Sequence, residues 1–170
     1  MKKFILTIFL AVISFVTLSA QSYMIVNSEK IFKSIAEYNS SLESLDLLAQ
    51  DYQKQVDTKF ATVETLYNDY MSKRESVSSS VRSMYEARIL EIETEATKFQ
   101  KSIFDTDGTL MKKRLELIQP IQERVFAAIK AYAAANGVEM VLDSSSNAAL
   151  LYNSDKVEHT EEVINYLKTH

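Results

Sequence analysis

The composition of this 170-residue chain leaves few residues that interrupt regular structure. It contains two glycines, one proline, no cysteine and no tryptophan, with 46% hydrophobic residues, 25% charged residues and a formal net charge of -4. These fractions are typical of a globular protein with one domain. Without cysteine the chain cannot form disulfides, zinc fingers or thiol nucleophiles, and two histidines leave little for a histidine metal centre. We therefore expect a loop-poor fold with no cofactor and no metal.

The first 20 residues have the zones of a secretory signal peptide. Lys2 and Lys3 precede an apolar run over residues 4–16, and a short segment ending at Ala20 leads to the expected cleavage site. The apolar run is shorter than the roughly 20 residues that span a membrane, which disfavours the alternative of an uncleaved anchor. Loss of the two lysines lowers the net charge from -4 to -6. We expect an exported mature chain with no membrane insertion and no general attraction for nucleic acid.

The mature chain begins with a short predicted strand and a short predicted helix. Residues 23–27 read as a β-strand. Ser28 is suited to cap a helix over residues 29–38, because its hydroxyl can accept a hydrogen bond from a free N–H of the first turn. We expect these elements, within residues 21–37, to form a compact body together with residues 118–170.

Apolar residues at steps of three and four predict a long helix that includes residues 42–70. The mean step is 3.5 residues, which is the heptad period that keeps one apolar seam against a partner helix. Polar and charged residues fill the other positions, so the opposite face is solvated. The seam consists of Leu42, Leu45, Leu48, Tyr52, Val56, Phe60, Val63, Leu66 and Tyr70.

Residues 73–80 interrupt this seam, and their serines favour a turn over a helix interior. The apolar pattern then resumes in two stretches that return along the first helix. The stretches are Val81, Tyr85, Ile89, Ile92, Ala96, Phe99 and Ile103, and then Met111, Leu115, Ile118, Ile121, Val125, Ile129 and Tyr132. The predicted fold is mostly α with a small β part, and its largest feature is a long antiparallel helical hairpin over residues 38–117, a coiled-coil arm with its tip near residues 74–81.

Two positions disturb the predicted return helix. Residues 105–108 (Asp-Thr-Asp-Gly) suggest a calcium loop, but with Gly108 at the sixth position the first ligand would be Ile103 and the glutamate position would be Arg114. The spacing excludes that site, and we interpret the segment as a local loosening, since glycine costs about 1 kcal/mol in a helix interior. Pro120 removes one backbone donor and is expected to kink the helix.

The return helix is expected to end at Asn136-Gly137, because glycine is the preferred residue just after a helix. Residues 138–142 and 149–152 then read as two further strands, separated by a polar turn. Thr160 can cap a last helix that continues to Lys168. Three strands of about five residues make a sheet too small to stand alone, so we expect other copies of the chain to cover it.

A serine hydrolase is the enzymatic alternative. Ser144, Ser145 and Ser146 follow Asp143, and His159 lies further along the chain. No Gly-x-Ser-x-Gly motif surrounds these serines, and a polar turn between strands accounts for them. We therefore expect no enzymatic activity and no catalytic residue.

Several segments outside the arm occur in a specific order. They are residues 24–32 (MIVNSEKIF), 117–121 (LIQPI), 135–144 (ANGVEMVLDS) and 150–152 (LLY). Joined by a charged, tyrosine-rich hairpin, they resemble the Skp/OmpH family of periplasmic chaperones for outer membrane proteins. The resemblance implies a periplasmic homotrimer whose strands form a small β-barrel body, with three helical arms around a cavity that holds unfolded outer membrane proteins.

The resemblance also implies which part of the chain forms the trimer. The interface is expected in the predicted strands. Its residues would be Ile25, Val26, Val138, Met140, Val141, Leu142, Leu150 and Leu151.

The charge of this chain differs from that of the family. Well-known members are strongly basic, whereas this mature chain is acidic, which weighs against contact with lipopolysaccharide or anionic membranes.

A holdase chaperone needs an adaptable apolar surface and no catalytic group. Tyrosine and methionine suit such contacts, because one is amphipathic and the other flexible. The candidate client-binding residues lie beside the seam and are Leu47, Tyr67, Met71, Met84, Leu90, Phe104 and Leu110. The alternative for each is that it only widens the seam. The second functional hypothesis is a structural or adaptor coiled coil of the cell envelope, which would leave few apolar residues unpaired.

Overall fold

The computed structural model describes residues 22–145 and 150–169. The predicted signal peptide, Ser146 and the start of the predicted third strand lie outside these residues. The prediction of a mostly helical chain with a small β part is confirmed, since 74% of the structure is helical and the sheet has two strands. The chain divides into an arm unit, Ile35–Arg124, and a body unit formed by the described residues on either side of it.

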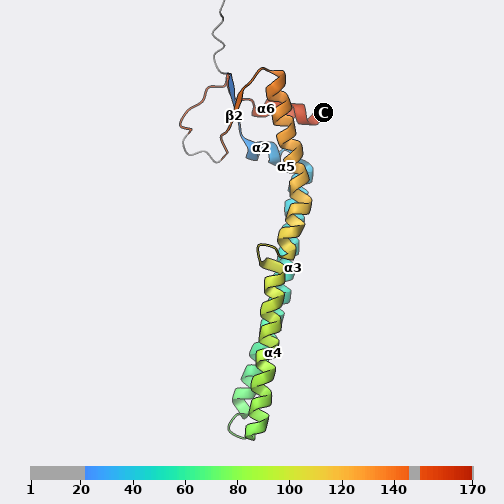
Figure 1. The fold of residues 1–170 in the computed structure, drawn as a ribbon, viewed down its shortest axis with the longest axis vertical. Coiled ribbons are helices and arrows are strands. Elements are labelled where there is room, and N and C mark those ends of the chain that lie inside the picture. The colour runs from blue at the N-terminus through green and yellow to red at the C-terminus, as the bar shows by residue number, and fades with distance from the viewer. Residues whose placement is uncertain (1–21, 146–149, 170) are drawn as a thin grey trace, which may run out of the picture. The chain divides into compact units, whose positions relative to one another are not determined.

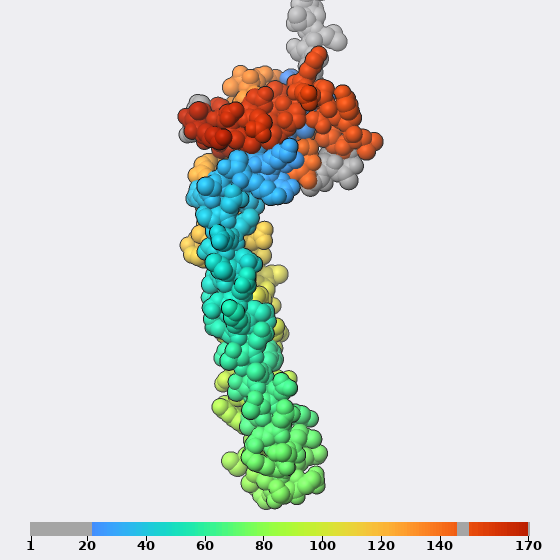
Figure 2. Space-filling view, turned by 180° about the vertical axis from the view of Figure 1, so that it is seen from behind, coloured from blue at the N-terminus to red at the C-terminus, as the bar shows by residue number. Residues whose placement is uncertain are grey.

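The arm unit is an antiparallel pair of long helices. Helix α3 (Ala36–Lys73) contacts α4 (Ser79–Phe104) side by side, as Figure 1 shows. Seen from the other side, α3 covers most of the visible face of this unit (Figure 2). Within α3 and α4 the predicted seam is buried or half-buried except at Leu42, with Val56 and Ala96 almost fully buried, whereas Met111 and Leu115 beyond α4 are exposed. The heptad spacing therefore identified the packed face correctly.

The tip of the hairpin is the turn at residues 74–78, which lies inside the predicted range of 74–81. Ser78 caps α4, because its hydroxyl accepts a hydrogen bond from the N–H of Val81. The hydroxyl of Ser76 donates to the carbonyl of Lys73 over 2.8 Å. Serine side chains thus replace the helical hydrogen bonds that the turn interrupts.

Two tyrosines join the helices next to the tip. Tyr70 and Tyr85 stack with ring centroids 5.4 Å apart. The Tyr70 hydroxyl donates to Glu86 over 2.6 Å, and the Tyr85 hydroxyl donates to Asp69 over 3.0 Å. The bond to Glu86 raises the pKa of Tyr70, and the bonds from Lys73 and Tyr85 lower the pKa of Asp69. Each helix therefore supplies both a tyrosine and a carboxylate to the other.

The return helix is divided at residues 105–108, where the sequence predicted only a loosening. Helix α4 ends at Phe104, and α5 (Thr109–Ala135) begins in the arm unit and ends in the body unit. The N–H of Gly108 donates to the carbonyl of Asp105 over 2.8 Å, which closes a tight turn. Pro120 is tolerated within α5.

Strand β1 (Tyr23–Val26) is the centre of the body unit. It pairs in parallel with β2 (Met140–Asp143) along one edge. Along the other edge the N–H of Ile25 donates to the carbonyl of Val157 over 2.7 Å, and the N–H of His159 donates to the carbonyl of Ile25 over 2.9 Å. Both edges of β1 are therefore satisfied by segments from the end of the chain.

The prediction of a third strand over residues 149–152 is wrong in its described part. Residues 150–152 form no strand, and Leu151 and Tyr152 are 94% and 82% exposed. The edge of β1 opposite β2, which that strand could have joined, is hydrogen-bonded to residues 157–159 instead. Val138, predicted to start the second strand, lies before β2.

The cap at the end of α5 follows the prediction. Gly137 has a φ of 66°, the left-handed conformation that glycine adopts without strain. The N–H of Val138 donates to the carbonyl of Ala133 over 2.9 Å, and the N–H of Gly137 donates to that of Ala134 over 3.3 Å. This pair of hydrogen bonds is a Schellman motif.

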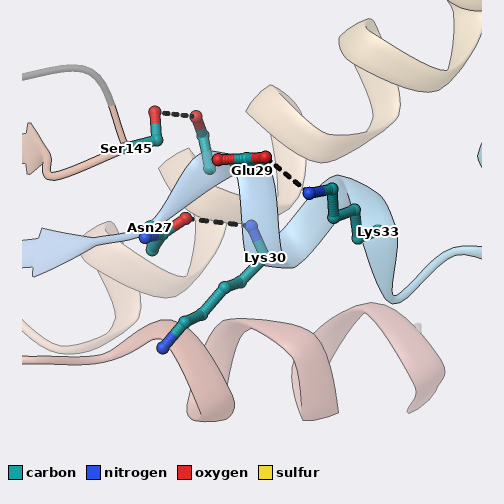
Figure 3. Close-up of polar contacts among 6 residues, drawn as sticks. Asn27, Glu29, Lys30, Lys33 and Ser145 are labelled. Carbon is teal, nitrogen blue, oxygen red and sulfur yellow. Dashed lines mark hydrogen bonds and ion pairs between the residues drawn. The ribbon is translucent and has the colours of Figure 1, made fainter.

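Helix α2 (Ser28–Lys33) is shorter than predicted and starts differently. Its N-cap is Asn27, whose Oδ1 accepts from the N–H of Lys30 over 2.9 Å (Figure 3). Ser28, the predicted cap, instead binds Asp143 through both its N–H (3.0 Å) and its hydroxyl (2.6 Å). The helix ends at Lys33 because Ser34 folds back onto the carbonyl of Ile31, over 2.7 Å.

Helix α6 (Thr160–Thr169) contacts α2 in the body unit, and the two are seen together in Figure 2. Thr160 begins the helix, but its hydroxyl oxygen accepts from the N–H of Asn27 over 2.7 Å and does not cap α6. The carbonyl of His159 accepts the first helical bond, from Val163. The most deeply buried residues of the body unit are Met24, Ile25, Val26, Ile31, Val125, Thr160 and Val163.

We predict that Asp143 makes the body unit more stable at neutral pH than in acid. Partial burial opposes its ionisation, but hydrogen bonds from Ser28 and Ser145 outweigh this and lower its pKa below the usual value. Its contribution is therefore complete above the unfolded pKa near 3.9 and disappears as the pH falls through the folded pKa. Asp143→Asn should lower stability at pH 7 by about 1 kcal/mol or less, because the group is exposed.

Urea unfolding at pH 7 and at pH 3 measures this difference. The gap between the parent and Asp143→Asn should shrink in acid. A gap of the same size at both pH values would contradict the assignment.

Candidate functional site

The predicted client-binding residues lie on the arm unit, beside the seam. Six of the seven are exposed, with Met84 at 69% and Leu90 at 64%, whereas Leu110 is half-buried. Tyr67 and Met71 are four residues apart on α3, so they share one stripe of that helix. The arm unit thus carries large apolar side chains that its own seam does not bury.

Three of these residues line two hollows: Met84 lines one, and Phe104 and Leu110 line the other. The tip groove has a volume of about 270 Å³, and the turn groove, beside the turn between α4 and α5, has a volume of about 260 Å³. The tip groove is lined by Leu66, Val81, Met84, Tyr85 and Arg88. The turn groove is lined by Leu42, Leu45, Phe104, Leu110, Met111 and Arg114. Each groove therefore combines apolar walls with one arginine.

A third, shallower hollow of about 550 Å³ runs along α3 and is lined mainly by small residues between Thr58 and Asp69. The hydroxyls of Thr58, Thr62 and Thr65 all donate to the carbonyl four residues before them, over 2.8 to 2.9 Å. These three hydroxyl donors are therefore already used within α3.

The sequence did not identify three exposed apolar residues of the arm unit, namely Leu42, Met111 and Leu115. Their spacing placed them in the seam. Met111 and Leu115 follow the break at residues 105–108, which divides the return helix, whereas Leu42 lies on α3. The pair Asp107-Gly108 was the signal that could have revealed this break.

The ion pairs of the arm unit are exposed. Most join residues three or four apart on one helix, such as Arg88 with Glu91 at 2.6 Å. Arg124 of α5 reaches Glu37 of α3 over 2.9 Å. Exposed pairs of this kind contribute about 1 kcal/mol or less each, so they add little to the stability of the arm unit.

The predicted interface residues are distributed unevenly over the body unit. Ile25 and Val26 are each 2% exposed, so their side chains are buried within a single chain and are not accessible to a second copy. Met140 is 54% exposed and, like Leu151, lies on the surface. The remaining predicted residues, Val138, Val141, Leu142 and Leu150, are half-buried. Exposed apolar residues of the body unit that the sequence did not single out are Tyr23, Phe126 and Tyr152.

The described part of the serine-rich segment does not form a catalytic arrangement. Ser144 and Ser145 bind the carbonyl of Val26 and the carboxylate of Asp143. Nδ1 of His159 lies 3.2 Å from the hydroxyl of Tyr132, and no described serine is hydrogen-bonded to this ring. Ser146 lies outside the described residues. No group of three metal-ligating side chains is found in the ranges that the structure describes.

Comparison with known proteins identifies the family. Residues 22–167 match the family described as outer membrane protein (OmpH-like). The chain belongs to this family, the Skp/OmpH family. Members of the family are periplasmic chaperones, not enzymes, and bind unfolded outer membrane proteins. No curated protein matches the chain significantly.

The match includes residues of both the arm unit and the body unit, because it extends from β1 into α6. Within residues 22–145 and 150–169, no helix combines the length and hydropathy needed to cross a bilayer.

Proposed function

We propose that this OmpH-like protein is a periplasmic holdase that binds unfolded outer membrane proteins and prevents their aggregation. The observation that carries the proposal is the exposure of large apolar side chains along both arm helices, beside a seam that is already buried. A holdase must bind many sequences weakly, and flexible or amphipathic side chains such as Met84 and Tyr67 suit that requirement.

We further propose that three copies assemble through their body units and hold the client between their arm units. Among the described residues, β2 has β1 as its one strand neighbour, so its outer edge is available to a second chain. Tyr23 and Met140, which are opposite each other in the sheet, are both exposed. A second copy that added a strand at this edge would extend the sheet and cover Tyr23 and Met140.

An adaptor coiled coil remains the second candidate. It would need arm helices that pair with further helices along their length. The buried seam between α3 and α4 favours the holdase, because the hairpin completes its own apolar contacts without a further helix. The large apolar residues that stay exposed are then available to an irregular client.

We predict that replacing the six exposed residues by serine will weaken client holding. The changes are Leu47→Ser, Tyr67→Ser, Met71→Ser, Met84→Ser, Leu90→Ser and Phe104→Ser. Half-protection of an outer membrane protein diluted from urea should need about tenfold more chaperone, since a loss of roughly 1.4 kcal/mol of apolar contact corresponds to a factor of ten. Light scattering against chaperone concentration measures the change.

The matched control replaces four exposed polar residues of the same helices by serine, namely Gln53, Gln55, Asn68 and Gln100, and should protect as well as the parent. Protection by the parent should survive high salt, because salt screens charges but leaves apolar burial intact. A six-serine variant that protects like the parent, combined with loss of protection in salt, would show electrostatic capture and contradict the proposal.

A further inference from the structure

We propose that the turn groove binds an extended client segment in which a large apolar side chain is followed, two residues later, by a carboxylate. The inference rests on the proposed holdase function and adds to it a chemical preference at one position of the arm unit. Its basis is the shape of the groove and the unpaired charge of Arg114.

The groove exists because the return helix is divided. Helix α4 ends at Phe104 and α5 starts at Thr109, so Phe104 and Met111 are exposed beside α3. Leu42 and Leu45 of α3 form the opposite wall. The volume of about 260 Å³ lies below the roughly 300–1,000 Å³ typical of small-molecule sites, so it suits one large side chain or two smaller ones.

Arg114 gives the groove its charge preference. It is the one charged residue that lines the groove, and it makes no hydrogen bond or ion pair with any described residue. Its neighbour Lys113 is by contrast paired with Glu116 over 2.8 Å. A guanidinium beside an apolar wall is complementary to a carboxylate, which it can bind through two parallel hydrogen bonds.

The spacing of the ligand follows from strand geometry. In an extended chain, residues i and i+2 point to the same side and are about 6.6 Å apart. A phenylalanine or leucine at i can therefore enter the groove while an aspartate or glutamate at i+2 reaches Arg114. The apolar face of a strand in an outer membrane barrel ends at the membrane interfaces, where a charge costs little, so an apolar residue followed at i+2 by a carboxylate is expected where a strand leaves the apolar band.

The test uses the full mature chain and two nine-residue peptides that differ at one position. Each has phenylalanine at position four among serine and glycine residues, with glutamate or glutamine at position six. Amide shifts of residues 104, 110 and 111, followed by nuclear magnetic resonance, report binding. The glutamate peptide should bind about two- to fivefold more tightly, the range expected for an exposed ion pair. Arg114→Gln should make the two peptides bind equally, and Arg114→Glu should make the glutamine peptide bind more tightly than the glutamate peptide.

Lys112→Gln is the matched control, because it removes the same charge two residues away on a side chain that does not line the groove. It should keep the preference for glutamate. An equal preference in the parent and in Arg114→Gln would overturn the inference. If neither peptide binds but anionic phospholipid vesicles bind in a way that depends on Arg114, the occupant is a lipid and the inference is wrong. If Phe104→Ser changes the native mass, the occupant is a second copy of the chain and the inference is also wrong.

The aggregation assay separates this inference from the proposed function. If Arg114→Gln loses the peptide preference and the parent still fails to protect any outer membrane protein, the groove is confirmed and the holdase function is wrong. If the parent protects but shows no preference between the peptides, the holdase function stands and the groove inference is wrong.

Discussion

Ile25→Asp is expected to unfold the body unit. The Ile25 side chain is 2% exposed, and its backbone N–H and carbonyl bind Val157 and His159. An aspartate there would place an unpaired charge in an apolar interior, at a cost on the order of 4 kcal/mol in addition to the lost apolar burial. That is a large part of the roughly 5–15 kcal/mol that stabilises a typical domain.

Met140→Asp is the matched change in the neighbouring strand. Met140 is exposed in the single chain, so the charge stays in water and the body unit should remain folded. If copies assemble over this face, Met140→Asp should lower the native mass while helicity is retained. Circular dichroism and native mass spectrometry on both variants give the two readouts. A folded, fully assembled Ile25→Asp protein would contradict the position of Ile25 in the core.

Gly108→Ala is expected to destabilise the arm unit around the turn. A β-carbon at this position would lie 2.5 Å from the carbonyl oxygen of Ile103 and 2.9 Å from that of Asp105. Both are backbone atoms, so the conflict is relieved only if the turn itself moves. We expect a loss of about 2 kcal/mol, within the range typical of disruptive single substitutions.

Hydrogen exchange of the amides in α4 and α5 next to the turn measures this loss, together with the thermal midpoint of the mature chain. Thr106→Ala is the control, because Thr106 is an exposed residue of the same turn and its change should stay within about 0.5 kcal/mol. If Gly108→Ala exchanged as slowly as Thr106→Ala, the turn would not depend on glycine.

The arm could be predicted from the sequence because its contacts repeat. Each seam residue between Leu45 and Tyr70 lies on the same face, so one period predicts the packing of most of α3. The sequence predicted only a loosening after Phe104, because a single glycine inside a helix has a small energetic cost. In the structure, the backbone of Ile103 and Asp105 leaves no room for a β-carbon at Gly108. This crowding depends on the folded turn and could not be predicted from the sequence.

The body unit was harder to predict because its contacts do not repeat along the chain and join residues that are far apart in the sequence. Asn27 and Ser28 are both good helix caps, and local preference could not choose between them. The choice is made by Asp143, which binds Ser28 from 115 residues away. In the same way, the backbone edge of β1 accepts residues 157–159, which have no strand pattern, and leaves the predicted strand at residues 150–152 unpaired.

The pairing of β1 with segments from the far end of the chain also sets an order of folding. Contacts within the arm hairpin can form as soon as residues 36–104 are available, whereas β1 has no partner until Met140 and then His159 have been delivered. A chain that emerges with its N-terminus first therefore carries an unpaired apolar strand through most of its own synthesis. During that interval this chain presents the same kind of exposed β-segment as the clients proposed for it.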